Sequence, residues 1–348
     1  MKILVLIDKF KGTISSNKLG SIAKNILTNE NRIVDYFPIS DGGDGFLDTI
    51  NFTERLNKKY CYAHNALGIV KKVPYYTSGH DVYIEVAKIV GFEKNIIFDI
   101  YNATSYGVGE VIVDAIKKGG KNFYIGLGGT ICNDCGKGML KALGFDFENN
   151  IINNSLIDFS NMRFNIISDV TNPLLGKKGA TYTFAKQKGA TEKDFPILEK
   201  RNRDFSKLVS KYLNFDYTKC KGAGAAGGLG FAFLSALKAT YHSGIDFTLN
   251  YLNIHSIVND YDLIITGEGK IDNQSLNGKV AMKILNSFNK PTILVCGINE
   301  LTNINNIPNL NGIYSIVPLF ASKKMSLKKP LYYYKRLIIY IGNCINNK

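Results

Sequence analysis

The sequence repeats one local pattern: a short apolar run, then a loop of glycine and acidic or amide residues, then a helix-forming segment. Lys2–Ile7, Asn122–Leu127 and Asp262–Thr266 each run into such a loop. Continuous apolar runs of this length are typical of parallel strands that are covered on both faces. Their alternation with helical segments predicts an α/β fold, in which ligands bind at the carboxyl ends of the strands.

The remaining periodicity completes this expectation. Ser15 or Ser16 is placed to cap a helix over Lys18–Leu27. We expect further helices over Gly107–Lys118, Gly136–Leu143, Ala281–Phe288 and Leu331–Ile345, and a helix that follows a Gly/Ala loop within Gly222–Leu237. We expect further strands at Val34–Ile39, Val70–Tyr76, Val82–Ala87, Phe164–Ser168, Gly179–Phe184 and Pro291–Cys296.

Composition limits the class of protein. The chain has 348 residues, of which 45% are hydrophobic and 21% charged, and it contains six scattered cysteines. This length predicts about two domains, and the composition excludes disordered, fibrous and disulfide-scaffold proteins. No apolar run approaches the roughly 18 residues that a membrane-spanning helix needs. We therefore expect a soluble, cytoplasmic protein.

The net charge of +14 raises the question of a nucleic-acid or acidic-membrane partner. The lysines are spread along the whole chain, and no block of five or more basic residues occurs. This distribution favours compositional drift over a nucleic-acid or membrane surface. A positive field would still help to capture a small anionic substrate.

Several common enzyme motifs are missing from the sequence. It has no P-loop, no dinucleotide-binding glycine motif after the first strand, no protein-kinase motif set and no hydrolase nucleophile elbow. Its four histidines lack metal-ligand spacing. Cys132 and Cys135 form a C-x-x-C pair without a second pair or a thioredoxin-like context, so we interpret them as loop residues.

Glycine loops with polar side chains remain as candidate sites. Asp41 and Asp44 flank two glycines, which suits a Mg²⁺ site or a base for a hydroxyl group, or else a plain turn. Asn133 and Asp134 follow the glycines of a strand–loop–helix segment, a geometry that binds anions but also simply caps helices. The glycine positions in this segment are Gly126, Gly128 and Gly129.

Two further glycine loops have different meanings. The run Gly222–Gly230 opens a helix and fits close core packing and a nucleotide wall equally well. Thr266–Asp272 combines Glu268 and Asp272 with Lys270 around glycines, and Gly278-Lys279 follows soon after. Two acids and two lysines around glycines would be costly in an apolar core. We therefore expect a polar pocket there.

Nine short patterns follow one another along the chain, at Ile7–Gly12, Asp41–Phe46, Glu85–Ala87, Thr104–Glu110, Gly128–Gly136, Asp169–Gly176, Ala185–Ala190, Gly222–Gly228 and Thr266–Asp272. In these patterns and their order the chain resembles the type I glycerate kinases over nearly its full length. Ile7 and Lys9 replace a Pro and a Ser of the first pattern, and Asp44 replaces a Glu in the second. All acids of the patterns but one are kept outright, and Asp44 keeps the charge of the Glu it replaces.

The resemblance implies ATP-dependent phosphorylation of D-glycerate, with the 2-hydroxyl as acceptor and a requirement for Mg²⁺. It also implies a Rossmann-like parallel-sheet domain with a second α/β domain inserted into it, and an active-site cleft between them. We expect the first domain to cover residues 1–65 and 255–348 and the inserted domain residues 66–254. D-Glycerate and ATP are then the partners, and the protein is a monomer or a homodimer. A kinase for another small hydroxy acid and a basic non-catalytic protein that binds nucleotide or nucleic acid are the alternatives.

Within this resemblance the matching positions receive hypothetical roles. Asp169 is the first candidate for the base that accepts the hydroxyl proton, and Asp134, next to Asn133, is the second. Lys11 and Lys188 are candidates for contacts with phosphate or with the glycerate carboxylate. The candidate Mg²⁺ ligands are Asp41, Asp44, Glu268 and Asp272, and the candidate nucleotide-binding glycines are Gly126, Gly128, Gly129, Gly222, Gly224, Gly227, Gly228, Gly267 and Gly269.

Overall fold

The computed structural model of the chain describes residues 1–53, 55–93, 99–147, 152, 157–273, 275, 279–301 and 307–346. The chain divides into two compact units. The first unit comprises Met1–Asp41, Asp48–Thr53 and Ile245–Lys348, and the second comprises Gly42–Leu47 and Glu54–Gly244. The domain limits that we expected, 65/66 and 254/255, stay a prediction. None of the helices among the described residues is long and apolar enough to cross a membrane.

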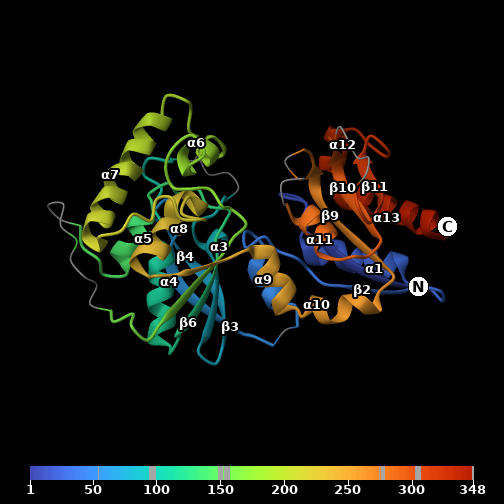
Figure 1. Cartoon of the computed structure of the whole chain (residues 1–348), viewed down its shortest axis with the longest axis horizontal. Coiled ribbons are helices and arrows are strands. Elements are labelled where there is room, and N and C mark those ends of the chain that lie inside the picture. Colours follow the sequence, from blue (N-terminus) through green and yellow to red (C-terminus); the bar gives the residue numbers. More distant parts are fainter. Residues whose placement is uncertain are drawn as a thin grey trace. The chain divides into compact units, whose positions relative to one another are not determined.

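A five-stranded sheet, parallel throughout, forms the centre of the first unit (Figure 1). The strand order is β11-β10-β9-β1-β2. Its strands are β1 (Lys2–Ile7), β2 (Ile33–Tyr36), β9 (Leu263–Ile271), β10 (Thr292–Asn299) and β11 (Leu310–Val317). The predicted strands at residues 2–7, 262–266 and 291–296 are thereby confirmed, although β9 and β10 extend further than expected. The strand predicted over 34–39 is confirmed only to Tyr36, where β2 ends.

Helices cover both faces of this sheet. Both faces are apolar, because successive side chains of a strand point to opposite faces. Ile3, Val5 and Ile7 of β1 pack with α1 and α13, whereas Leu4 and Leu6 pack with the opposite helical layer. The helices of the unit are α1 (Ser16–Leu27), α9 (Gly244–Tyr251), α10 (Ile254–Ile257), α11 (Val280–Ser287), α12 (Lys323–Lys328) and α13 (Pro330–Asn346), together with a 3₁₀ turn at Val258–Asp260. Ser15 caps α1, accepting a hydrogen bond from the Lys18 N–H at 3.4 Å, as predicted.

The second unit contains a six-stranded mixed sheet with the order β3-β4-β5-β6-β7-β8. The first three strands are antiparallel, and β5 to β8 are parallel. The strands are β3 (Asn57–His64), β4 (Val70–Ser78), β5 (Asp81–Glu85), β6 (Asn122–Gly126), β7 (Arg163–Ile167) and β8 (Thr240–His242). The predicted hairpin around Ser78-Gly79 is the β4–β5 pair.

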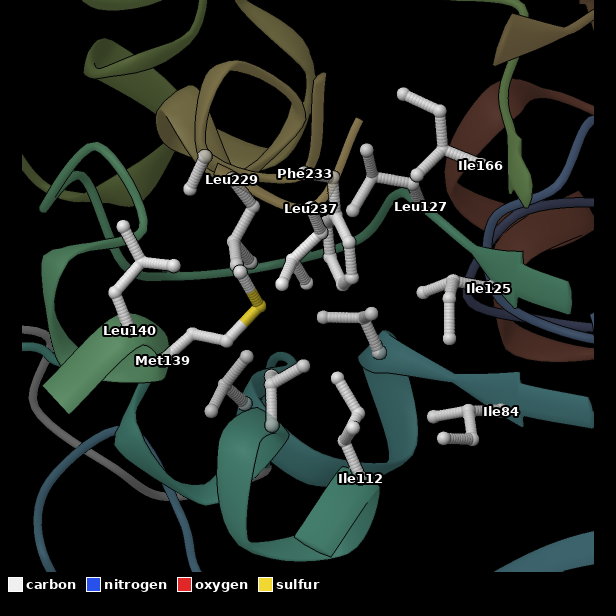
Figure 2. Close-up of a cluster of buried hydrophobic side chains, with 14 of the residues drawn as sticks. Ile84, Ile112, Ile125, Leu127, Met139, Leu140, Ile166, Leu229, Phe233 and Leu237 are labelled. Carbon is white, nitrogen blue, oxygen red and sulfur yellow. The ribbon is translucent and has the colours of Figure 1, made fainter. Parts of the chain in front are cut away.

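The core of the second unit lies between this sheet and a set of helices. Figure 2 shows Ile84 and Ile125 from β5 and β6 facing Ile112 of α4, Met139 of α5 and Phe233 of α8. The helices are α3 (Val86–Val90), α4 (Tyr106–Lys117), α5 (Lys137–Ala142), α6 (Ala180–Phe184), α7 (Phe195–Leu213) and α8 (Ala225–Ala236), with a 3₁₀ turn at Lys186–Lys188. The short helix α2 (Phe46–Ile50) carries residues of both units.

One predicted strand is wrong. Gly179–Phe184 was expected to be extended, but it forms the short helix α6, in which the Thr183 N–H donates to the Gly179 carbonyl at 3.1 Å. A short run with threonine, tyrosine and phenylalanine has strand propensity, and periodicity cannot separate it from a buried helical turn. The helix buries Ala180 and Thr181 completely, and this tertiary packing outweighs the local preference.

Candidate active site

A polar cavity of about 500 Å³ opens at the carboxyl ends of β1 and β9 in the first unit. The chain leaves β1 for β2 on one side, and β9 and β10 lie on the other side, so this is the switch point where open α/β sheets bind ligands. The lining residues are Asp8, Lys9, Phe10, Lys11, Thr13, Asp41, Glu268, Gly269, Lys270, Lys279, Gly297, Ile298, Ile316, Lys323, Ser326, Leu327 and Pro330.

Two buried carboxylates, Asp8 and Glu268, lie at the bottom of this cavity. The Asp8 N–H donates to the Gly267 carbonyl at 3.0 Å, which places Asp8 beside the middle of β9, where Gly267 directly precedes Glu268 in that strand. Burial raises the pKa of Asp8 to about 7, and burial likewise raises the pKa of Glu268 to about 7. Asp8 Oδ1 and Glu268 Oε1 accept no hydrogen bond from any residue that the structure describes. Such oxygens are costly to bury unless a cation binds them.

Lysines partly compensate these acids. Lys9 Nζ lies 3.1 Å from Asp41 Oδ1 and 3.7 Å from Asp8 Oδ1. Lys279 Nζ lies 4.0 Å from Glu268 Oε2 on the other side of the cavity. Each of these acids therefore has a lysine within 4.0 Å, and the exposed Lys11 adds a further cation to the cavity lining.

The four predicted Mg²⁺ ligands lie at different places in the structure. Asp41 and Glu268 line the cavity, and the exposed Asp44 belongs to the second unit. Asp272 accepts hydrogen bonds from the Ser275 N–H at 3.1 Å and from Lys279 Nζ at 3.2 Å. Burial acts to raise the pKa of Asp272, but these bonds outweigh it and the pKa is lowered. Asp272 therefore orients Lys279. Among the described residues no group of three or more His, Cys, Asp or Glu forms a ready-made metal site.

In the second unit the first candidate base, Asp169, follows β7 and is half-buried. Asp169 Oδ1 accepts a hydrogen bond from Ser243 Oγ at 2.9 Å. The side-chain amide of the nearby Asn172 donates to the Lys178 carbonyl at 2.7 Å. Asn172 therefore shapes the loop after Asp169.

Asp134, the second candidate base, already receives several donors. Its Oδ2 accepts from the N–H and the hydroxyl of Ser105, both at 2.8 Å, and from the Gly138 N–H at 3.1 Å. Its Oδ1 accepts from the Gly136 N–H at 3.2 Å. Asp134 thus joins the first turns of α4 and α5, the capping role that the sequence left open beside ligand binding.

Lys188 and Asn133 are both 2% exposed. Lys188 Nζ donates to the Cys132 carbonyl at 2.7 Å, and burial lowers the pKa of Lys188. Asn133 Nδ2 donates to Thr181 Oγ1 at 3.4 Å, while Asn133 Oδ1 has no donor among the residues that the structure describes. Lys188 holds the backbone of the loop before α5, and Asn133 keeps one acceptor available.

Close packing explains the glycines before and within the first turn of α8. A Cβ atom would lie 2.3 Å from the Pro173 carbonyl oxygen at Gly224, 2.0 Å from the Cys132 carbonyl oxygen at Gly227, and 2.7 Å from Cys135 Cα at Gly228. At Gly222, where φ is +84°, it would lie 2.5 Å from the Tyr241 ring. The sequence left two interpretations of this run open, close core packing and a nucleotide wall. These direct contacts support close packing. Cys132 and Cys135 are buried in the same region, and burial raises the pKa of both thiols.

The other candidate glycines also lie against backbone or side chains. A Cβ atom would lie 2.6 Å from the Phe46 ring at Gly126, 2.9 Å from Gly43 Cα at Gly128, and 3.2 Å from Ala87 Cβ at Gly129. At Gly267 it would lie 1.9 Å from the Val295 carbonyl oxygen, inside the sheet. Gly269 is different, because it lines the cavity, and a Cβ atom there would lie 3.3 Å from Phe10 Cα.

Sequence reasoning gave no functional role to Asp8 or Glu85, although each lies within one of the nine patterns. Asp8 carried a signal, since it is an acid directly after a buried strand, the position where α/β sheets place ligand-binding groups. Glu85 carried the same signal at the end of β5. Lys279 was expected in a polar pocket with Glu268, Lys270 and Asp272, and it lines the cavity.

Known proteins are similar to this chain over nearly its whole length. Residues 3–345 match the glycerate kinase family. The chain is 32% identical to a glycerate 2-kinase of Escherichia coli (strain K12), covering 92% of this chain and 91% of that protein, and 32% identical to a glycerate kinase of Bacillus subtilis (strain 168), covering 91% of each. A crystal structure described as glycerate kinase 2 from Salmonella typhimurium LT2 aligns with a TM-score of 0.77 at 28% identity, covering 100% of this chain and 98% of that one. The agreement extends over both units, and the chain belongs to the glycerate kinase family.

Proposed function

We propose that this protein transfers the γ-phosphoryl group of ATP to the 2-hydroxyl of D-glycerate, giving 2-phosphoglycerate and ADP, with Mg²⁺ as the required cation. Family membership supports the class of reaction and the acceptor. The observation that carries the proposal is the pair of buried carboxylates, Asp8 and Glu268, in a cavity lined by lysines. Each carboxylate has an oxygen that accepts no hydrogen bond from a described residue.

The two carboxylates fit a magnesium ion. Mg²⁺ prefers oxygen ligands, and in phosphoryl-transfer enzymes one or two carboxylates commonly hold it together with waters and substrate phosphates. Asp8 and Glu268 would supply those carboxylates. When bound, Mg²⁺ neutralises charge that develops on the phosphate oxygens. Asp41 would remain bound to Lys9 and keep that lysine beside the cavity.

The cavity also fits a nucleotide. Its volume of about 500 Å³ lies within the usual range of about 300–1,000 Å³ for small-molecule sites. Ile298, Ile316 and Leu327 form an apolar wall that suits a base, whereas glycerate offers no apolar surface to cover it. Lys11 and Lys279 are the cations that we assign to phosphate oxygens, because transferring phosphoryl groups are stabilised by fixed positive charge.

The second unit supplies the groups that we assign to the acceptor. Asp169 is the proposed base: its carboxylate receives the hydroxyl proton, and Ser243 orients it through one oxygen. Asn133 Oδ1 is an available acceptor for a substrate hydroxyl. Lys188 acts on the substrate only indirectly, by fixing the loop that carries Asn133.

A coupled ADP-release assay over small hydroxy acids tests the proposal. We expect turnover with MgATP and D-glycerate, and background rates after addition of EDTA. Lactate, which lacks the 3-hydroxyl, should retain some turnover, whereas 3-hydroxypropionate, which lacks the 2-hydroxyl, should show none. A preference for a different acid would favour the alternative of another hydroxy-acid kinase. Absence of ADP release with every acid would contradict a kinase function.

A further inference from the structure

The segment Gly42–Leu47, which we call the Asp44 loop, lies across the carboxyl ends of three parallel strands of the second unit. Glu85, Gly126 and Ile167 are register partners at the ends of β5, β6 and β7. The loop is pressed onto this row: a Cβ atom at Gly42 would lie 2.2 Å from the Ile167 carbonyl oxygen. Phe46 is fully buried, against Gly126.

The contact that fixes the middle of this loop is made by one side chain. Glu85 Oε1 accepts a hydrogen bond from the Gly45 N–H at 3.2 Å, and Glu85 Oε2 accepts one from the Leu47 N–H at 2.9 Å. Glu85 is 0% exposed, and the nearest cation, Lys88 Nζ, lies 3.8 Å from Oε1. The carboxylate thus uses both oxygens on two of the three amides that follow Asp44, whose own side chain is exposed.

We infer that Glu85 is a positioning residue for the reaction: it acts through the Gly45 and Leu47 amides to hold Asp44 in its working orientation. A structural role in the core would not require both oxygens to face the loop. A buried carboxylate is expensive, and apolar residues would fill that space at lower cost. Two hydrogen bonds to a charged acceptor are strong and directional, and therefore fix a short glycine-rich loop that would otherwise sample many conformations. The inference rests on the proposed function together with the prediction from the sequence that Asp44 is a Mg²⁺ ligand in that phosphoryl transfer.

A double-mutant cycle in kcat tests whether Glu85 acts through Asp44. Glu85→Gln keeps the shape but replaces one acceptor oxygen with an NH₂ group, and we expect kcat to fall about 10–100-fold, the size of a small misplacement. We expect the kcat of Asp44→Asn to fall at least as far. The kcat of the double variant should be no more than about threefold below that of the less active single variant, because the effects of residues that act as a unit are not additive. Losses that multiply, or wild-type kcat in Glu85→Gln, would overturn the inference.

Two further variants make the result specific. Glu85→Asp keeps the charge but withdraws the oxygens from the amides, so it should also lose kcat; retained kcat would mean that charge alone matters. The matched control is Glu110→Gln, since Glu110 also accepts a backbone N–H, that of His64 at 2.7 Å, at a different place in the same unit. This control should keep wild-type kcat. A loss as large as that of Glu85→Gln would make the effect unspecific and contradict the inference.

Hydrogen exchange separates this inference from the proposed function. The Gly45 and Leu47 amides should be protected in the wild type and should exchange at least about tenfold faster in Glu85→Gln, while the amides of β6 stay unchanged. Unchanged protection would overturn the positioning role whatever the enzyme's activity. Faster exchange in a protein that releases no ADP with any hydroxy acid would leave Glu85 as the anchor of the loop and place the failure in the proposed function.

Discussion

Asp8→Asn should abolish turnover and at the same time make the protein more stable. We expect kcat to fall about 10³-fold, since the substitution removes a buried charge that would hold the Mg²⁺ ion of the proposed reaction. The free energy of unfolding should rise at pH 8, because the folded wild-type protein must keep an ionised Asp8 away from water. The pKa of about 7, compared with the ordinary 3.8, sets an upper limit of about 4 kcal/mol at about 1.36 kcal/mol per pH unit.

The stability difference has a defined pH dependence. In the unfolded chain Asp8 ionises near its ordinary pKa of 3.8, whereas in the folded protein it ionises only near about 7. Between these values the folded state binds the additional proton, so wild-type stability falls as the pH rises through this window. The advantage of Asp8→Asn should therefore be absent below pH 4, grow up to pH 7 and stay constant above it. Urea unfolding at pH 4.5, 6 and 8 measures it.

A surface acid of the same unit provides the control. Asp35 is paired with Lys24 at 3.2 Å and lies outside the cavity lining, so Asp35→Asn should keep its kcat and show no gain in stability. Near-wild-type turnover in Asp8→Asn would remove Asp8 from the reaction. Loss of turnover together with a lower free energy of unfolding would instead mean that Asp8 supports the fold.

Asp169→Asn should reduce kcat about 10²–10⁴-fold, the usual contribution of a general base. This equals about 2.7–5.4 kcal/mol of activation free energy at about 1.36 kcal/mol per decade. The asparagine oxygen can still accept the hydrogen bond from Ser243, so packing should survive while basicity is lost. The melting temperature should therefore stay within about 2 °C of the wild type.

The comparison of kcat with melting temperature for this variant decides between two roles. A purely structural Asp169 would tolerate asparagine, since both side chains can accept the same hydrogen bond. Turnover near that of the wild type would exclude Asp169 as the base. Asp134 could not simply replace it in the account, because its carboxylate already joins α4 and α5 through four hydrogen bonds at 2.8–3.2 Å.

The sequence allowed most of the central layers to be predicted, because buried parallel strands leave a strong local signal. Lys2–Ile7 is apolar throughout, and both of its faces are covered by helices in the fold. The edge strand β3 was missed, since its exposed lysines and tyrosines lack a clear alternation. The wrong strand at Gly179–Phe184 had the opposite cause: its residues favour strands, but burial of Ala180 and Thr181 decides for a helix.

The candidate site was less predictable because a motif does not separate ligands from packing. Gly227 and Gly228 belong to the most glycine-rich pattern of the chain, and each has its own steric reason in the contact between α8 and the Cys132–Cys135 turn. Asp8 is a single acid after a strand, and the other buried carboxylate of the cavity, Glu268, lies 260 residues away in the sequence. Parallel pairing of β1 with β9 brings the two together, and no local pattern contains that pairing.

Phosphorus NMR of the reaction product tests the central claim most directly. With MgATP and D-glycerate the γ-phosphate signal should disappear, and a new phosphomonoester signal should rise together with ADP. In 2-phosphoglycerate the phosphorus couples to the single proton on carbon 2, so the proton-coupled signal should be a doublet. A triplet would show transfer to the 3-hydroxyl, and release of inorganic phosphate without any phosphomonoester would contradict a glycerate kinase reaction altogether.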